Sequence, residues 1–192
     1  MTPSSHTPLK SICLLLLAGS ILAGGCVPAV SLLAIDVVRD EREPRAYWQD
    51  NKAEMDIRFS IHRNKTISDT NVSVTIWNAV VLLTGEVPDQ QAIDRILDIA
   101  KSHHYTRQVV NRIELAGRTN MASRVNDSWL TGRVKTALVV SGTVDPTRFK
   151  VVTERANVYL MGLVTSAEAT EAVLIVRSVP GVVRVIKVFE YL

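Results

Sequence analysis

The chain has 192 residues, of which 47% are hydrophobic and 21% charged, and its 22 Lys and Arg against 19 Asp and Glu give a net charge of +3. A balance this close to neutral does not favour nucleic-acid binding through bulk charge. The length allows one ordinary domain or two very small ones, and two cysteines are too few for a disulfide framework.

Residues 1–25 have the features of a bacterial secretory signal. Lys10 precedes an apolar run from Ile12 to Ala18, and the small residues Ala23-Gly24-Gly25 lead directly into Cys26. The apolar run is too short to span a bilayer, because a spanning helix needs ~20 apolar residues. We therefore expect this segment to be a signal peptide that directs export and is removed from the mature protein.

The residues before Cys26 resemble the lipobox of bacterial lipoproteins, with Leu22 one place further from the cysteine than in the usual pattern. The resemblance implies that Cys26 carries the lipid. Val27, in place of an aspartate, then favours the periplasmic side of the outer membrane. With Cys13 lost in the signal, no thiol nucleophile or cysteine-based metal site would be left. The alternative is a soluble secreted protein, because small residues also satisfy ordinary signal cleavage.

The region 26–54 is predicted to be a tether between the lipid and the first domain. Residues 27–38 are apolar, and a mixed-charge run from Arg39 to Arg45 contains the helix breaker Pro44. This composition is typical of a membrane-proximal linker rather than of a packed element.

An internal repeat covers residues 55–115 and 124–192, with a linker at 116–123. Its anchor is the match of Val-Leu-Leu-Thr-Gly-Glu-Val at 81–87 with Val-Tyr-Leu-Met-Gly-Leu-Val at 158–164. In each copy the spacing of apolar residues predicts a helix, two strands, a helix and a strand, in that order. Helices are predicted around 56–64, 92–100, 127–140 and 169–176, and strands at 72–79, 81–87, 108–115, 149–157, 158–164 and 184–191.

The pattern predicts an α+β fold of two tandem αββαβ domains, each a three-stranded mixed sheet with two helices on one face. Such a domain buries only a small core, so docking of the two copies should stabilise both. Gly85 and Gly162 follow the second strand of each copy, where a glycine indicates a bulge or a close backbone approach. Asp89 and Ser166 are the predicted N-caps of the helices that come next.

The Val-x-Leu-x-Gly-x-Val signature of both copies and the turn Pro180-Gly181-Val182 resemble the BON domain family of bacterial envelope proteins. The second copy is the closer match, and it includes Asn126-Asp127-Ser128-Trp129. In the first copy, His103-His104-Tyr105 stands where the family usually has a glycine-valine turn. Two such domains behind a lipidated cysteine resemble the dual BON-domain lipoproteins of the Gram-negative outer membrane.

The sequence holds no recognisable set of catalytic residues. A glycine-rich phosphate loop, a nucleophile elbow and a supported Ser/His/Asp set are all missing. His103 and His104 have no carboxylate at metal-ligand spacing, and Asp94 and Asp98 are interpreted as the solvated face of a helix. We therefore expect a protein that is not an enzyme and that has no cofactor, no metal, no nucleic-acid partner and no small-molecule substrate.

The predicted helix around 127–140 carries a stripe of residues beside its core face. The residues that should meet the sheet follow helical spacing: Leu130, Val134, Ala137 and Leu138. The separate stripe on one flank consists of Trp129, Arg133, Thr136 and Val140. A tryptophan above an arginine suits a lipid–water interface, where the indole sits at headgroup level and the guanidinium meets phosphate. The alternative is that Trp129 packs against the first domain or the linker and that Arg133 is solvated.

The BON resemblance implies that the second domain binds anionic phospholipid through this helix, with Trp129 in the contact. It further implies a lipid-anchored periplasmic protein that supports outer-membrane integrity and envelope remodelling at the division site. The competing hypothesis is a protein-interaction adaptor, in which the same stripe docks an envelope assembly factor or a regulator of peptidoglycan amidases.

Overall fold

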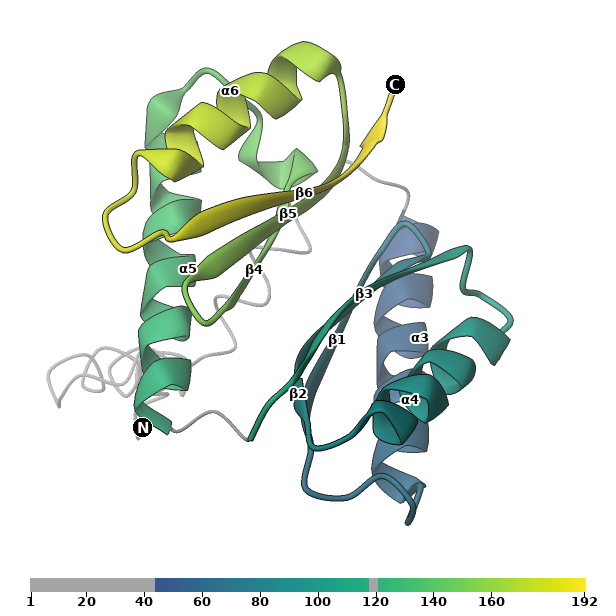
Figure 1. Ribbon diagram of the computed structural model, residues 1–192. Helices are drawn as coiled ribbons and strands as arrows, with labels where there is room; N and C mark the ends of the chain where they lie inside the picture. The colour runs from purple at the N-terminus through teal and green to yellow at the C-terminus, as the bar shows by residue number, and fades with distance from the viewer. Residues whose placement is uncertain (1–43, 118–120) are drawn as a thin grey trace, which may run out of the picture. The chain divides into compact units, whose positions relative to one another are not determined.

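The computed structural model describes residues 44–117, here called domain 1, and residues 121–192, here called domain 2 (Figure 1). The signal peptide and the predicted lipid-attachment residue Cys26 lie outside these residues. Domain 1 consists of α3 (Pro44–Arg63), β1 (Asn71–Trp77), β2 (Val80–Val87), α4 (Gln90–Ser102) and β3 (Gln108–Leu115). Domain 2 consists of α5 (Met121–Ser141), a 3₁₀ turn (Pro146–Arg148), β4 (Lys150–Glu154), β5 (Asn157–Val164), α6 (Ser166–Arg177) and β6 (Arg184–Tyr191). The predicted α+β fold of two αββαβ units is confirmed.

The two domains contain the same mixed sheet. In domain 1 the strand order is β1-β2-β3, with β1 antiparallel and β3 parallel to β2. In domain 2 the order is β4-β5-β6, with the same directions. A parallel pair needs a crossover connection, and α4 and α6 supply it.

Side chains at the starts of α4 and α6 satisfy backbone donors that a helix leaves free. The Asp89 carboxylate accepts from the Ala92 amide at 2.8 Å, so the predicted N-cap of α4 is confirmed. In α6 the prediction of Ser166 is wrong by one residue, because Thr165 is the cap. The Thr165 hydroxyl accepts from the Glu168 amide and the Glu168 carboxylate accepts from the Thr165 amide, which is a complete capping box.

The helices that open the two domains begin earlier than predicted. α3 begins at Pro44, within the predicted tether 26–54, and α5 begins at Met121, within the predicted linker 116–123. The first half of α3 buries Asp50 and Ala53 against domain 1. An aspartate and an alanine give only a weak apolar periodicity, and the surrounding charges obscured the helix. A proline is nevertheless well suited to the first turn of a helix.

Each sheet packs one face against its own two helices. The core of domain 1 joins Ile57 of α3 and Ile96 of α4 to Leu83 of β2. The core of domain 2 likewise joins Val134 of α5 and Ala172 of α6 to Leu160 of β5. All of these residues are fully or almost fully buried.

The sheet faces that carry no helix pack on each other. Trp77, Val80 and Leu82 of domain 1 form one buried cluster with Tyr159 and Met161 of domain 2. All eight residues of β2 are therefore buried, because one face meets the helices and the other meets domain 2. The two domains, residues 44–117 and 121–192, belong to one compact unit. Figure 1 shows the sheets between α5 on one side and α3 on the other.

The two repeated glycines lie inside β2 and β5, not after these strands as predicted, at points where a neighbouring backbone approaches closely. A Cβ on Gly85, whose φ is +112°, would lie 1.8 Å from the Asn71 carbonyl oxygen. A Cβ on Gly162 would lie 2.4 Å from the Arg148 carbonyl oxygen, without a positive φ. Contacts this short are not found between real atoms, so the predicted close approach is confirmed at both positions.

We predict that Gly162→Val destabilises domain 2 by about 1–3 kcal/mol, because the Arg148 carbonyl has to move away from the new side chain. Thermal unfolding followed by circular dichroism measures the change. The matched control is Gly132→Ala in α5, where the added Cβ meets nothing within 4 Å. This control should stabilise the helix by about 0.5–1 kcal/mol. Equal melting temperatures for Gly162→Val and the unchanged chain would contradict the prediction.

Candidate functional site

The predicted stripe on α5 lies along one open groove. Trp129, Arg133, Thr136 and Val140, here called the α5 surface, all line it. The opposite wall comes from the end of α6 and the turn that follows, at Ser178, Val179 and Pro180. The groove has a volume of about 650 Å³, and most of its lining is apolar. The structure therefore brings the four residues together and adds a second wall that lies far away in the sequence.

Trp129 lies outside the core of domain 2. Leu130, Val134 and Leu138 of the same helix are buried, whereas Trp129 is 58% exposed and Val140 is 77% exposed. The alternative in which Trp129 packs against domain 1 is not what the structure shows. An exposed indole of this kind presents both an apolar ring and an N–H donor to whatever binds there.

Arg133 is held in a fixed place beside the indole. Its guanidinium carbon lies 4.6 Å from the centre of the Trp129 ring, which is a cation–π contact. Its Nη1 donates to the Pro180 carbonyl oxygen at 3.0 Å. A guanidinium has five N–H donors, so this bond leaves others for an anionic oxygen. Arg133 is therefore oriented by its neighbours before any ligand binds.

The turn after α6 positions Pro180. Gly181 has a φ of +98°, and the Leu130 side chain lies 3.6 Å from where a Cβ would be. The turn is closed by a hydrogen bond from the Val182 amide to the Val179 carbonyl, and the Val183 amide donates to Ala156. The turn Pro180-Gly181-Val182 thus directs the Pro180 carbonyl toward Arg133.

Other features of the α5 surface were missed or differ from the prediction. The Thr136 hydroxyl donates to the Gly132 carbonyl at 2.9 Å, so it is already engaged by the helix backbone. Val125 and Val139 of α5 are also exposed. Helical spacing from Trp129 could have identified both valines, because they lie on the side of α5 that faces away from the core. The contribution of Pro180 had no signal in the sequence.

Two buried aspartates shape equivalent β-turns. The Asp127 carboxylate accepts from the backbone amides of Arg155-Ala156, both at 2.8 Å. Asp50 does the same for Asn78-Ala79, at 2.9 Å and 3.0 Å. All four turn residues have positive φ between 50° and 62°, a conformation that needs such support in residues other than glycine. Asp127 of the Asn-Asp-Ser-Trp segment is therefore a structural residue that ties α5 to its sheet.

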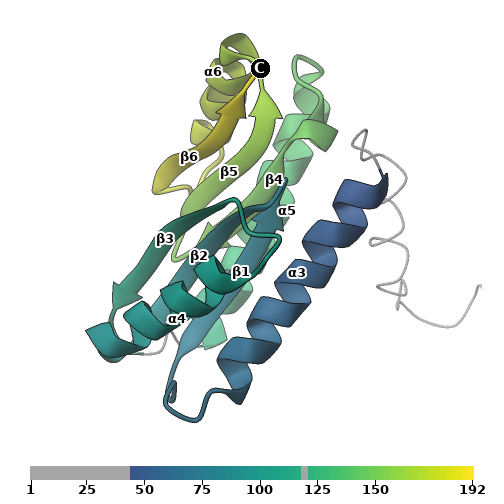
Figure 2. The same ribbon diagram turned by 90° about the vertical axis from the view of Figure 1, so that its right-hand side faces the viewer.

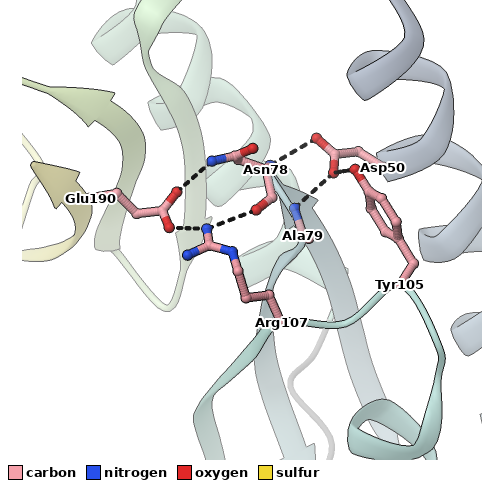
Figure 3. A network of polar contacts seen from close by, with 6 residues as sticks. All are labelled: Asp50, Asn78, Ala79, Tyr105, Arg107 and Glu190. Carbon is pink, nitrogen blue, oxygen red and sulfur yellow. Dashed lines mark hydrogen bonds and ion pairs between the residues drawn. The ribbon is translucent and has the colours of Figure 1, made fainter. Parts of the chain in front are cut away.

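The His103-His104-Tyr105 segment contributes to the same arrangement in domain 1. The Tyr105 hydroxyl donates to Asp50 at 3.0 Å (Figure 3). The His103 ring lies 3.6 Å from Asp56 and stacks on His104. Within residues 44–117 and 121–192, no group of three or more His, Cys, Asp or Glu side chains is arranged to hold a metal ion.

Polar contacts between the domains are reciprocal. The Glu190 carboxylate accepts from Asn78 Nδ2 at 2.7 Å and pairs with Arg107 (Figure 3). In the other direction, the Arg155 guanidinium pairs with Glu114 at 2.7 Å. Asn78 and Arg155 occupy equivalent turns, and Glu114 and Glu190 occupy equivalent places in the third strands. Each domain thus binds the last strand of the other through its first β-turn.

Glu154 lies at the end of β4 among other carboxylates. Burial, followed by the negative charges of Glu86 and Asp127, raises the pKa of Glu154 to about 7. Glu86 is fully buried and accepts from Asn71 Nδ2 at 2.9 Å. The folded protein therefore holds a proton on Glu154 at pH values at which the unfolded chain has lost it.

The chain is similar to a known protein family and to bacterial proteins that include an outer membrane lipoprotein. The BON domain family matches residues 49–117 and 126–192. The outer membrane lipoprotein DolP of Haemophilus influenzae is 34% identical over 190 residues, which cover 97% of this chain and 98% of DolP. The 21 kDa hemolysin of Actinobacillus pleuropneumoniae is 28% identical over 153 residues, 79% of each protein. A solved structure of CdsD, a structural protein of the type III secretion system of Chlamydia trachomatis, aligns with a TM-score of 0.30 and 12% identity, over 72% of this chain and 91% of that one.

We predict that Glu154→Gln makes the melting temperature less dependent on pH. Because the pKa of Glu154 is raised from 4.5 to about 7 in the folded protein, stability falls as pH rises through this interval. The variant should match the unchanged chain near pH 5 and melt at a higher temperature at pH 8. Asp98→Asn, at an exposed position on α4, is the charge-matched control. A Glu154→Gln variant that loses stability equally at both pH values would refute this account.

Proposed function

The chain belongs to the BON domain family, and from this premise we propose that it is an outer-membrane lipoprotein that binds anionic phospholipid through the α5 surface of domain 2. Its similarity to the outer membrane lipoprotein DolP extends over 97% of the chain and supports the class of protein. The lipid binding is proposed from the groove itself. The observation that carries it is the exposed Trp129 beneath the fixed guanidinium of Arg133.

The chemistry of the α5 surface suits the boundary between lipid headgroups and acyl chains. An indole prefers this boundary because its ring is apolar and its N–H is polar. The Arg133 donors that Pro180 does not use are free to meet phosphate oxygens. Exposed Val125, Val139 and Val140 continue the apolar surface along the helix. Burying them among headgroups removes apolar area from water, which favours binding.

The arrangement amounts to an anchor with two parts. An acyl chain alone holds a protein to a membrane only marginally, and a second contact makes the attachment stable. Here the lipid on Cys26 would be the first part and the α5 surface the second. A basic side chain near an anionic membrane adds about 1 kcal/mol, and salt weakens this contribution. The second part would therefore respond to lipid composition.

We further propose that the protein is not an enzyme and faces the periplasm. Among the described residues, no helix combines the length and the apolarity needed to cross a membrane. The expected contribution to outer-membrane integrity and to envelope remodelling at the division site follows from the BON resemblance.

A protein-docking role for the same groove is the second candidate. Tryptophan and arginine are the residue types that most often dominate binding energy at protein interfaces. An envelope assembly factor or an amidase regulator would then occupy the groove. The two candidates differ in one measurable respect, because only the first requires affinity for protein-free vesicles.

We predict that the soluble form lacking Met1 to Cys26 binds phosphatidylglycerol vesicles and not phosphatidylcholine vesicles in a co-sedimentation assay. Trp129→Glu should lower the affinity at least ~10-fold, because it places a carboxylate where the indole enters the headgroups. Leu174→Glu is the control, since Leu174 is exposed on α6 outside the groove. The melting temperature of Trp129→Glu should stay close to that of the parent form. If Trp129→Glu still binds fully, protein docking becomes the first candidate.

We also predict that Cys26→Ser abolishes acylation and releases the protein from the membrane fraction. Mass spectrometry of the mature N-terminus and fractionation of cells measure the two effects. A mature wild-type chain that begins with a free, unmodified cysteine would show that the lipoprotein assignment is wrong.

A further inference from the structure

Helix α3 of domain 1 has a solvent-exposed apolar side of its own. Trp48 is 64% exposed, Met55 70% and Phe59 59%. With ~100° per residue, these three side chains fall within one narrow sector of the helix. The buried residues Ala53 and Ile57 lie on the opposite side. The apolar sector thus points directly away from the core of domain 1.

The repeat places this side of α3 where domain 2 has the α5 surface. Asp50 and Asp127 hold equivalent turns, so the two helices can be aligned on them. The alignment matches Lys52 with Trp129, Phe59 with Thr136, and Arg63 with Val140. Both domains therefore direct the same sector of their first helix to solvent, and in both it carries aromatic and apolar side chains.

Cations accompany the apolar residues of α3. The Arg63 guanidinium carbon lies 5.3 Å from the centre of the Phe59 ring, one helical turn away. Domain 2 has the same kind of pair in Arg133 and Trp129. Lys52 lies between Trp48 and Phe59 along the sector, and the carboxylate at its edge, Asp56, is bound to Lys52. Asp56 offsets the charge of Lys52, whereas Arg63 stands over an aromatic ring. Aromatic side chains with a basic group beside them are complementary to an anionic headgroup layer.

We propose that Trp48, Lys52, Met55, Phe59 and Arg63, here called the α3 face, form a second membrane-binding surface with affinity for anionic phospholipid. The affinity of the α3 face for lipid is independent of the function proposed for domain 2. One consequence rests on that function: with two binding surfaces, one molecule bridges two bilayers.

Bridging follows from where the two helices lie. α3 packs on the side of its sheet that faces away from domain 2, and α5 packs on the side of its sheet that faces away from domain 1. Figure 1 shows both sheets between the two helices, and in Figure 2, turned by 90°, α3 lies nearer to the viewer than α5. One flat bilayer cannot meet both surfaces at once. Two bilayers, or two vesicles, can.

The test uses the form that begins at Val27, which keeps every described residue, with vesicles of phosphatidylglycerol and phosphatidylcholine or of phosphatidylcholine alone. Co-sedimentation measures binding, and turbidity measures aggregation of the vesicles. The unchanged form should bind and aggregate only the anionic vesicles. The double variant Trp48→Glu with Phe59→Glu should still bind through α5 but should not aggregate them. The matched control, Leu115→Glu with Leu174→Glu, adds the same charge at exposed apolar sites outside both surfaces.

Variants of α5 separate this proposal from the proposed function. Trp129→Glu should abolish aggregation and keep residual binding, which the added Trp48→Glu and Phe59→Glu should remove. If Trp129→Glu alone removes all binding, the α3 face has no lipid affinity and the present proposal is overturned, while the proposed function stands. If Trp129→Glu changes nothing and the α3 substitutions remove all binding, the reverse holds.

Tryptophan fluorescence gives a second readout without added charge. In Trp129→Phe the emission comes from Trp48 and from Trp77, which is buried and should not respond to vesicles. We expect a blue shift when anionic vesicles are added, because Trp48 leaves water. The proposal fails if the emission does not shift and the α3 substitutions do not change the aggregation of vesicles. The α3 face would then bind a protein partner, a second copy or the N-terminal segment of the chain.

Discussion

The packing of the two sheets on each other is the constraint on which the rest of the structure depends. A domain of this size buries too little apolar surface to be stable with a large margin. Trp77 and Leu82 of domain 1 pack with Tyr159 of domain 2 in a third buried cluster, which the two domains share. Aromatic side chains contribute large buried areas to such a contact. Because β2 and β5 then lie between apolar layers on both sides, neither sheet has a free face to offer a ligand.

This constraint moves binding to the outer helices. The first helix of each domain has one side committed to the core and the other side in water. The committed side varies little in character: both helices bury aliphatic side chains and one aspartate that holds a β-turn. The outer side is free to differ, and Lys52 in α3 stands where α5 has Trp129. The two domains therefore present the same kind of helix to solvent, and the exposed residues of each helix decide what it contacts.

The sequence predicted those parts of the molecule whose signals are local. Strand alternation, the repeated glycines and the Asp89 cap were enough to establish both αββαβ units and their order. The stripe of Trp129 and Arg133 was also found, because helical spacing separates it from Leu130 and Val134. What the sequence did not reveal depends on contacts between distant segments. Pro180 reaches Arg133 only through the fold, and the start of α3 was hidden because its buried residues include Asp50.

Electrostatics across the interface were likewise invisible before the fold was known. Glu154 and Glu86 are far apart in the chain, and nothing in their local sequence shows that the docked sheets bring them together. The same applies to Arg107 and Glu190, whose pairing spans the two domains. A charged residue in a β-rich segment is most often solvated. Which group such a residue pairs with depends on the sheet of the other domain, and the local sequence pattern carries no information about that sheet.

The reciprocal contacts of Asn78 with Glu190 and of Arg155 with Glu114 describe an isologous interface inside one polypeptide. In a symmetric homodimer, a single-domain chain with an arginine in its first turn and a glutamate on its last strand would form both contacts from one sequence. Covalent linkage replaces the second molecule of such a dimer with a neighbour at an effective concentration that reaches the millimolar range for short linkers. Assembly of the two halves then no longer depends on how much protein the cell makes. Once the halves need not be identical, each is free to acquire its own surface.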